Sequence, residues 1–245
     1  MSALLRAELL KLRTTRTFAA LVGSALALSL LVVVLTATLS DGLDEEDVRD
    51  LFTGDFTSLF ILILGVMGMT GEWRHRTITS SVLAAPDRVR LLAAKTIAYA
   101  VAGAVLSLIV TVTIMAVGSV ILSARGETTA GLADLLDVLW RNLTVAALLG
   151  AFGVGIGALL RNQVAAIIGV LVFSFIVEPA VIALAPDVGR FGPTLGAPTA
   201  ILDFESEFED EGDILGPAAG VAVLLGWIVA AFAAGAALLR SRDLT

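Results

Sequence analysis

The chain has 245 residues, of which 58% are hydrophobic and 16% are charged, and its mean hydropathy is +0.95. Soluble domains are closer to about 45–50% apolar and about 25% charged, so this composition excludes an ordinary soluble protein. The absence of cysteine excludes a disulfide framework, a thiol nucleophile and a cysteine-based metal site. The net charge is −7, but acids and bases are segregated along the chain, which gives no basis for nucleic-acid binding.

Residues 1–17 are basic and predict a helix lying at the membrane surface. They carry four basic residues against the single acid Glu8, and three leucines at helical spacing (Leu5, Leu9, Leu12) form a narrow apolar stripe. The apolar run that follows, about 18–39, is longer than the core of a signal peptide, which is about 7–15 residues. Because five more such runs follow, we expect a first membrane span rather than a cleaved leader.

Apolar runs of roughly 20 residues recur along the whole chain, and this length crosses about 30 Å of hydrocarbon as a helix. The predicted spans are residues 18–39, 52–71, 96–122, 142–160, 164–185 and 214–239. No segment between them is large enough for a soluble domain. The sequence therefore predicts an all-α polytopic membrane protein with one transmembrane domain over residues 1–245.

Basic residues alternate with acidic ones from one connecting segment to the next. The N-terminus, residues 71–95, the hinge 161–163 and the C-terminus together hold twelve of the sixteen Lys and Arg residues. Lys and Arg in short loops favour the cytoplasmic side, so both termini are expected to be cytoplasmic. Only two of the sixteen are lysines (Lys11 and Lys95), a bias typical of GC-rich bacterial genomes, and we therefore expect a bacterial cell membrane.

Motifs for enzymatic chemistry are missing from the sequence. The one Lys-Thr pair, Lys95-Thr96, has Val89 where a phosphate-binding loop needs its first glycine, so ATP cannot bind in that way. Gly153-Val-Gly-Ile-Gly-Ala158 matches a dinucleotide fingerprint formally, but it lies inside a predicted span with no preceding strand. The single histidine, His75, cannot build a catalytic triad or a multi-histidine metal site. We expect no enzymatic activity, cofactor or metal in this chain.

Small and ionisable residues inside the spans have structural explanations and rival functional ones. Glycines let helix backbones approach closely, and we favour this role over substrate contact for Gly153, Gly157, Gly216 and Gly220, and for Gly65 and Gly68. Glu178-Pro179 predicts a kink in the fifth span. We expect Glu178 to reach interfacial water there, with a role in gating or substrate exit as the alternative.

The basic island, residues 71–95, has the layout of a coupling device. Residues 77–83 predict a short amphipathic helix, Pro86-Asp-Arg88 a turn that starts a helix, and the remainder leads into the third span. A short helix across the cytoplasmic mouth of a bundle can press on a partner and move two spans together.

The island also resembles a known family. Gly71-Glu-Trp-Arg-His75, Thr77-Ile-Thr79, Leu83-Ala-Ala-Pro86, Arg88 and Lys95 look like the type-2 ABC-transporter permeases, especially the compact six-span bacterial members. Glu8-x-x-Lys11-x-x-x-Thr15-Arg16 resembles their N-terminal helix, and Glu178-Pro179 with Arg190-Phe-Gly-Pro193 resembles their last exterior loop. One departure is Arg76, where a glycine is common.

The resemblance implies a permease subunit that exports a drug-, antibiotic- or lipid-like solute. Two permease subunits would pair with two cytoplasmic ATP-binding-cassette subunits, which would bind the ATP and magnesium. It further implies that two segments contact the ATPase: the N-terminal helix (Glu8, Lys11, Arg16) and the island (Glu72, Arg74, His75, Arg76, Thr77, Pro86, Arg88, Lys95).

Two other classes stay open from the sequence. An ion-coupled secondary transporter would need internal repeats and acids near the membrane midplane, and only Glu178 qualifies even loosely. A non-transporting membrane protein, such as a sensor or an immunity protein, would need no ATPase. A neighbouring reading frame with a phosphate-binding loop would favour the ABC permease over both.

Overall fold

The structure is a computed structural model that describes residues 1–75, 77, 87–204 and 215–241. The described part is helical and contains no strand. Its helices are α1 (Ser2–Thr14), α2 (Arg16–Leu39), α3 (Glu45–Thr53), α4 (Thr57–Arg74), α6 (Arg88–Arg125), α7 (Leu132–Leu159), α8 (Gln163–Val172), the π-helical turn η1 (Phe173–Val177), α9 (Glu178–Leu184), α10 (Pro186–Gly189), α11 (Gly196–Leu202) and α12 (Pro217–Ser241).

Six helical segments of the described chain are long and apolar enough to cross a membrane, which confirms the all-α, six-span prediction. They are Arg16–Leu39, Glu45–Arg74, Arg88–Arg125, Leu132–Leu159, Gln163–Leu184 and Pro217–Arg240. Several extend beyond the predicted bounds, because charged residues continue the helices past the apolar runs. The clearest case is α7, which begins ten residues before the predicted 142.

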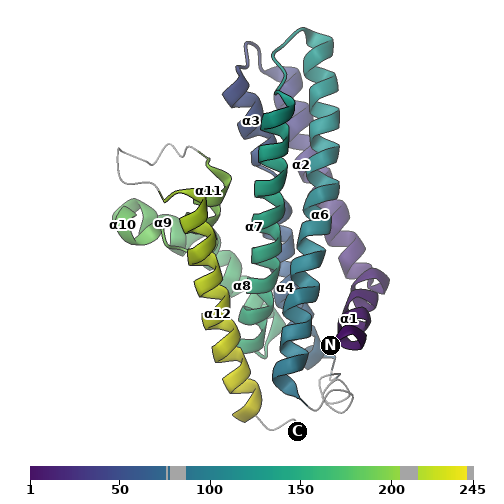
Figure 1. Ribbon diagram of the computed structural model, residues 1–245, viewed down its shortest axis with the longest axis vertical. Coiled ribbons are helices and arrows are strands. Elements are labelled where there is room, and N and C mark those ends of the chain that lie inside the picture. Colours follow the sequence, from purple (N-terminus) through teal and green to yellow (C-terminus); the bar gives the residue numbers. More distant parts are fainter. Residues whose placement is uncertain (76, 78–86, 205–214, 242–245) are drawn as a thin grey trace.

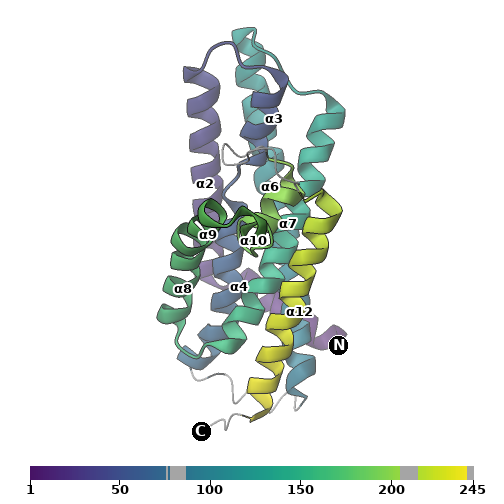
Figure 2. The same ribbon diagram turned by 90° about the vertical axis from the view of Figure 1, so that its left-hand side faces the viewer.

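The fourth span, α7, is the centre of the bundle. In its most apolar window, 67% of the residues are buried, and α4, α6 and α12 pack around it. The fifth span is peripheral, with only 11% of its window buried. From α8 through η1 and α9 to α10 the chain runs outward from the bundle, as Figures 1 and 2 show.

Helix boundaries follow local capping chemistry. Asp44 and Asp47 form a capping box at the start of α3, and the Asp87 carboxylate accepts the Val89 and Arg90 N–H groups at 3.1 Å to start α6. Gly126 ends α6 with φ of 75°, a left-handed conformation that favours glycine. These caps fix where the long helices begin and end.

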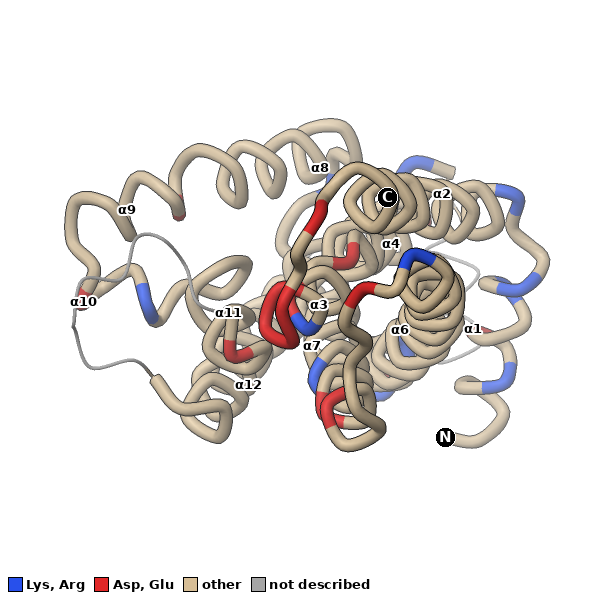
Figure 3. Tube along the Cα trace, turned by 90° about the horizontal axis from the view of Figure 1, so that it is seen from above, with Lys and Arg blue, Asp and Glu red and all other residues tan. Residues whose placement is uncertain are grey.

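The two ends of the bundle differ in charge. The N-terminus, the start of α6 and the C-terminal end of α12 lie at one end, as an even number of spans requires (Figure 1). Seen from the opposite end, acidic residues gather at α3 and at the connection between α6 and α7 (Figure 3). That α1 lies at the membrane surface, and that its end of the bundle is cytoplasmic, stay predictions.

Candidate functional site

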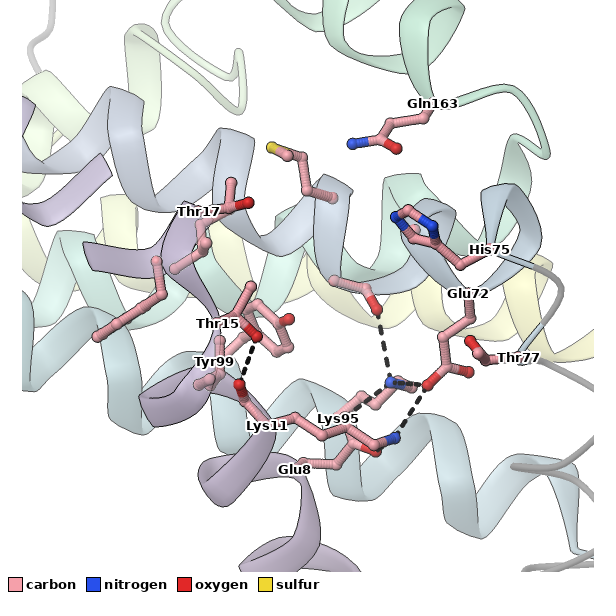
Figure 4. Close-up of a pocket in the computed structure, with 16 residues that line it drawn as sticks. Glu8, Lys11, Thr15, Thr17, Glu72, His75, Thr77, Lys95, Tyr99 and Gln163 are labelled. Atoms are coloured by element: carbon pink, nitrogen blue, oxygen red, sulfur yellow. Dashed lines mark hydrogen bonds and ion pairs between the residues drawn. The ribbon is translucent and has the colours of Figure 1, made fainter. Parts of the chain in front are cut away.

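Four charged side chains hold α1 against α4 and α6, and we call them the charge cluster: Glu8, Lys11, Glu72 and Lys95 (Figure 4). Lys95 Nζ lies 2.7 Å from Glu8 Oε2 and 2.7 Å from Glu72 Oε1. Lys11 Nζ lies 2.7 Å from Glu8 Oε1 and 3.1 Å from Glu72 Oε1. Each lysine therefore bridges both carboxylates, and the cluster is electrically neutral.

The helices bring these residues together from three parts of the chain. Glu8 and Lys11 are three residues apart, so they share one face of α1. Glu72 is in the last turn of α4 and Lys95 is near the start of α6, so both lie at the same end of the bundle. Lys95 Nζ also donates to the Gly68 carbonyl at 3.4 Å. The cluster is thus a three-way joint between α1, α4 and α6.

Three of the four side chains in the charge cluster are buried, so their ion pairs are shielded from water. The Lys95 side chain is 1% exposed and both carboxylates are buried, whereas Lys11 is 52% exposed. Burial of Glu8 opposes its ionisation, but the charges and hydrogen bonds of Lys95 and Lys11 outweigh it and lower the pKa of Glu8. The pKa of Lys11 is raised, because its bonds to Glu8 and Glu72 outweigh partial burial. Both charged forms are therefore favoured at neutral pH.

A cavity of about 530 Å³ adjoins the cluster (Figure 4). The charge cluster, Thr15, Thr17, His75, Thr77 and Gln163 supply polar groups, and Leu12, Phe18, Leu64, Met67 and Tyr99 supply apolar surface. The described residues contain no group of three or more His, Cys, Asp or Glu that could hold a metal ion. The lining of the cavity therefore combines charged, hydroxyl and apolar groups.

The predicted coupling residues divide between this site and its surroundings. Glu72, His75, Thr77 and Lys95 of the island line the cavity together with Glu8 and Lys11 of α1.

The other predicted positions lie elsewhere. Arg74 faces Gln163, with Nη1 3.4 Å from Oε1, and Arg88 donates to the Leu239 carbonyl on α12. Arg16 begins α2 and is exposed. Arg76, Pro86 and all but the first residue of the expected helix over 77–83 lie outside the described residues.

Glu178 differs from our expectation that it reaches water. It is 2% exposed, and its carboxylate accepts the N–H groups of Thr194 at 3.0 Å, Leu195 at 2.8 Å and Gly196 at 2.9 Å. The Thr194 hydroxyl donates to it as well. The carboxylate therefore holds the start of α11 against α9. The N–H and O–H donors of residues 194–196 take the place of the water molecules that we expected around Glu178.

The glycines proposed for helix packing separate into two groups. A Cβ on Gly157 would lie 2.7 Å from the Val66 carbonyl oxygen, and one on Gly220 would lie 2.8 Å from that of Ala197. Gly153 likewise lies against Leu62 of α4. Gly216 does not share this role, since a Cβ there would meet no atom within 4 Å.

Comparison with known proteins identifies the family. The family model described as ABC-2 family transporter protein matches residues 4–177, which is more than half of the chain. The chain belongs to the ABC-2 transporter family. Comparison with curated proteins gave no match. The matched range runs from α1 to the end of η1 and contains the whole charge cluster.

Membership makes the protein a membrane transport subunit that is not itself the ATPase. This agrees with the lack of a phosphate-binding loop in the sequence. The chain is therefore a permease of this family.

Two polar groups of the permease were not singled out from the sequence. Asp55, in the break between α3 and α4, accepts the Thr111 hydroxyl at 2.8 Å and the Thr57 N–H at 2.9 Å. Arg49 and Arg141 share Asp137 and Asp203, which ties α3 and α7 to the end of α11. In both cases the sequence shows a charged residue inside or beside an apolar run. It does not show the partners of that residue, because they are distant in the sequence.

Proposed function

We propose that the permease is the membrane subunit of an ATP-driven bacterial exporter in the cell membrane. A separate ATP-binding-cassette subunit would bind and hydrolyse ATP with magnesium, and α1 with the loop between α4 and α6 would form its contact surface. The observation that carries this proposal is the charge cluster. It ties the two predicted ATPase-facing segments into one body, so a force on either would move both.

The cluster also provides a mechanical path into the membrane. α1 leads through Thr15 directly into α2, Glu72 lies in the last turn of α4, and Lys95 lies near the start of the 38-residue helix α6. A movement of α1 would therefore reach the first three spans at once. Bistable rearrangement of such a packed joint is a physically reasonable way to couple ATP hydrolysis to the membrane helices.

The cavity supports an amphipathic solute of the drug, antibiotic or lipid type. Its volume of about 530 Å³ lies within the range of about 300–1,000 Å³ found for small-molecule sites. A second permease subunit would complete the transporter, and the exposed apolar residues of η1 offer it a surface, for example Phe175 and Ile176.

The test is affinity purification of the tagged permease from native membranes. We expect a subunit with a phosphate-binding loop to co-purify, and its ATP hydrolysis rate to change when the permease is present. Purification of the permease without any such subunit, together with transport that continues when ATP is depleted, would contradict the proposal.

The ion-coupled alternative has one observation in its favour, namely Asp55 beside Thr111 at a break within the second span. It predicts transport driven by a proton or sodium gradient and abolished by Asp55→Asn. The ATP-driven proposal predicts transport that survives an ionophore and stops when ATP is removed.

A further inference from the structure

A second cavity, of about 490 Å³, opens at the same end of the bundle as the charge cluster. Arg74, Arg161, Asn162, Gln163 and Val164 line it. Arg74 ends α4, and the other four residues form the turn into α8 and its first positions. The end of α4 and the turn before α8, which are distant in sequence, thus place two guanidinium groups around one space.

These two arginines differ from four other arginines of the permease in the groups that they contact. Arg49, Arg125, Arg141 and Arg190 each form an ion pair with an aspartate. Within the described part of the chain, neither Arg74 nor Arg161 pairs with a carboxylate. Their positions are fixed by neutral groups instead.

Arg74 donates to the buried Gln163 amide at 3.4 Å, and the Arg161 guanidinium lies 4.9 Å from the centre of the Trp73 ring. The cavity therefore has a concentrated and preorganised positive charge.

The cavity lies at the level where lipid head groups are expected. Arg74 ends the second candidate span, and Arg161 lies between the fourth and fifth. Trp73 beside them is an amphipathic residue of the kind enriched at the membrane–water interface. Basic sites between spans at this level suit the phosphate of an anionic lipid.

An apolar surface continues from this cavity into the membrane-spanning region. Val164 lines the cavity, and Val164, Ile168 and Val172 are spaced four residues apart and exposed, so they form one ridge along α8. A phospholipid has the matching arrangement, with a phosphate above an acyl chain. Guanidinium groups bind phosphate oxygens through paired N–H donors.

We propose that Arg74 and Arg161 bind the phosphate of an anionic phospholipid, with one acyl chain along the Val164–Val172 ridge. The lipid joins the end of α4 to the start of the loosely packed fifth span. This inference does not depend on the proposed export function.

Brominated lipids test the proposal in the intact permease. With Trp140→Phe and Trp227→Phe, Trp73 is the only tryptophan left and reports on lipids beside Arg161. The permease is placed in nanodiscs of phosphatidylcholine with increasing dibrominated phosphatidylglycerol or dibrominated phosphatidylcholine, and quenching of Trp73 is measured. Each arginine near the surface favours an anionic lipid by about fivefold, so we expect about a 25-fold preference for phosphatidylglycerol at this site.

The double variant Arg74→Gln/Arg161→Gln is expected to lose this preference. The matched control Arg6→Gln/Arg13→Gln, which removes the same charge from α1, is expected to keep it. Equal quenching by the two brominated lipids, or equal loss in the control variant, would overturn the proposal. Displacement by millimolar inorganic phosphate without any preference for phosphatidylglycerol would assign the arginines to a soluble anion and would also overturn it. Loss of quenching only when an ATPase subunit is added, again without lipid preference, would assign them to a protein surface instead.

Discussion

Replacement of Lys95 by methionine is the sharpest perturbation of the charge cluster. Methionine has nearly the length of lysine but no charge, so Glu8 and Glu72 would keep only the half-exposed Lys11 as a partner. Removal of one partner from a buried ion pair costs about 3–5 kcal/mol, which is roughly two to four orders of magnitude in the docking of α1. Glu8 and Leu12 are the buried residues of α1, and the partly buried Leu5 and Leu9 are its other contacts with the core, so the charge cluster is a main anchor of this helix.

The absence of cysteine makes the assay direct. Leu12→Cys introduces a single, nearly buried thiol whose reaction with a polar maleimide measures undocking of α1. We expect reaction at least tenfold faster in the Lys95→Met background. Lys11→Met, which removes an exposed partner worth about 1 kcal/mol or less, should change the rate less than about fivefold. Additional Glu8→Gln and Glu72→Gln substitutions should restore protection, because no unpaired buried charge is left.

A single buried thiol on α7 separates undocking of α1 from global unfolding. Ala158→Cys should stay protected in the Lys95→Met variant, since Ala158 is fully buried where α7 packs against Gly235 of α12. An unchanged Leu12→Cys reaction rate in Lys95→Met would refute the reasoning about the cluster. Exposure of both thiols would show that the fold as a whole depends on Lys95.

Three further outcomes follow from packing, hydrogen bonding and pKa values. Gly157→Ala should lower the free energy of unfolding in detergent by about 1–3 kcal/mol, because its Cβ would lie 2.7 Å from the Val66 carbonyl oxygen. Gly169→Ala should leave the free energy of unfolding unchanged, because a Cβ there would meet no atom within 4 Å. Glu178→Ala should speed trypsin cleavage after Arg190 more than Glu178→Gln does, because alanine leaves three N–H groups without an acceptor, whereas glutamine keeps one acceptor oxygen. Equal cleavage rates in the two variants would contradict this expectation. Protection of Leu12→Cys should be constant from about pH 5 to pH 10. Because the pKa of Glu8 is lowered, its contribution to the docking of α1 is fully present above its usual pKa of 4.5 and is lost as the pH falls through the lower value. Because the pKa of Lys11 is raised, its contribution to docking is fully present up to its usual pKa of 10.5 and is lost only at higher pH. A loss of protection near pH 7 would contradict the assignment.

The fold was largely predictable because each span is an uninterrupted apolar run. Span number follows from helix length and bilayer thickness, which are local properties. The break at Gly54–Phe56 was not predicted, since it depends on contacts with residues far along the chain: Ser29 accepts the Phe56 N–H at 3.0 Å, and Thr111 donates to Asp55. Likewise, the packing of α8 against α4 is a tertiary contact that the composition of the fifth span does not indicate.

The candidate site was predictable as a set of residues but not as an arrangement. Family resemblance selected Glu8, Lys11, Glu72 and Lys95, and the structure brings all four into one cluster. Nothing in the sequence indicated that they contact each other, because α1, α4 and α6 meet only through tertiary packing. Glu178 was misjudged for the opposite reason, since an acid beside a proline suggests exposure when the donors of a later turn are not visible.

ATP hydrolysis by the purified transporter decides whether the α1 and α4–α6 segments couple the permease to an ATPase. We expect the permease to co-purify with a subunit that carries a phosphate-binding loop, and to alter the hydrolysis rate of that subunit. Glu72→Ala and Arg74→Ala should lose this alteration while inserting normally into the membrane. Glu46→Ala, an exposed acid at the other end of the bundle, should keep it. Normal permease-dependent hydrolysis in both the Glu72→Ala and the Arg74→Ala variant would contradict the claim that the α1 and α4–α6 segments couple the permease to its ATPase.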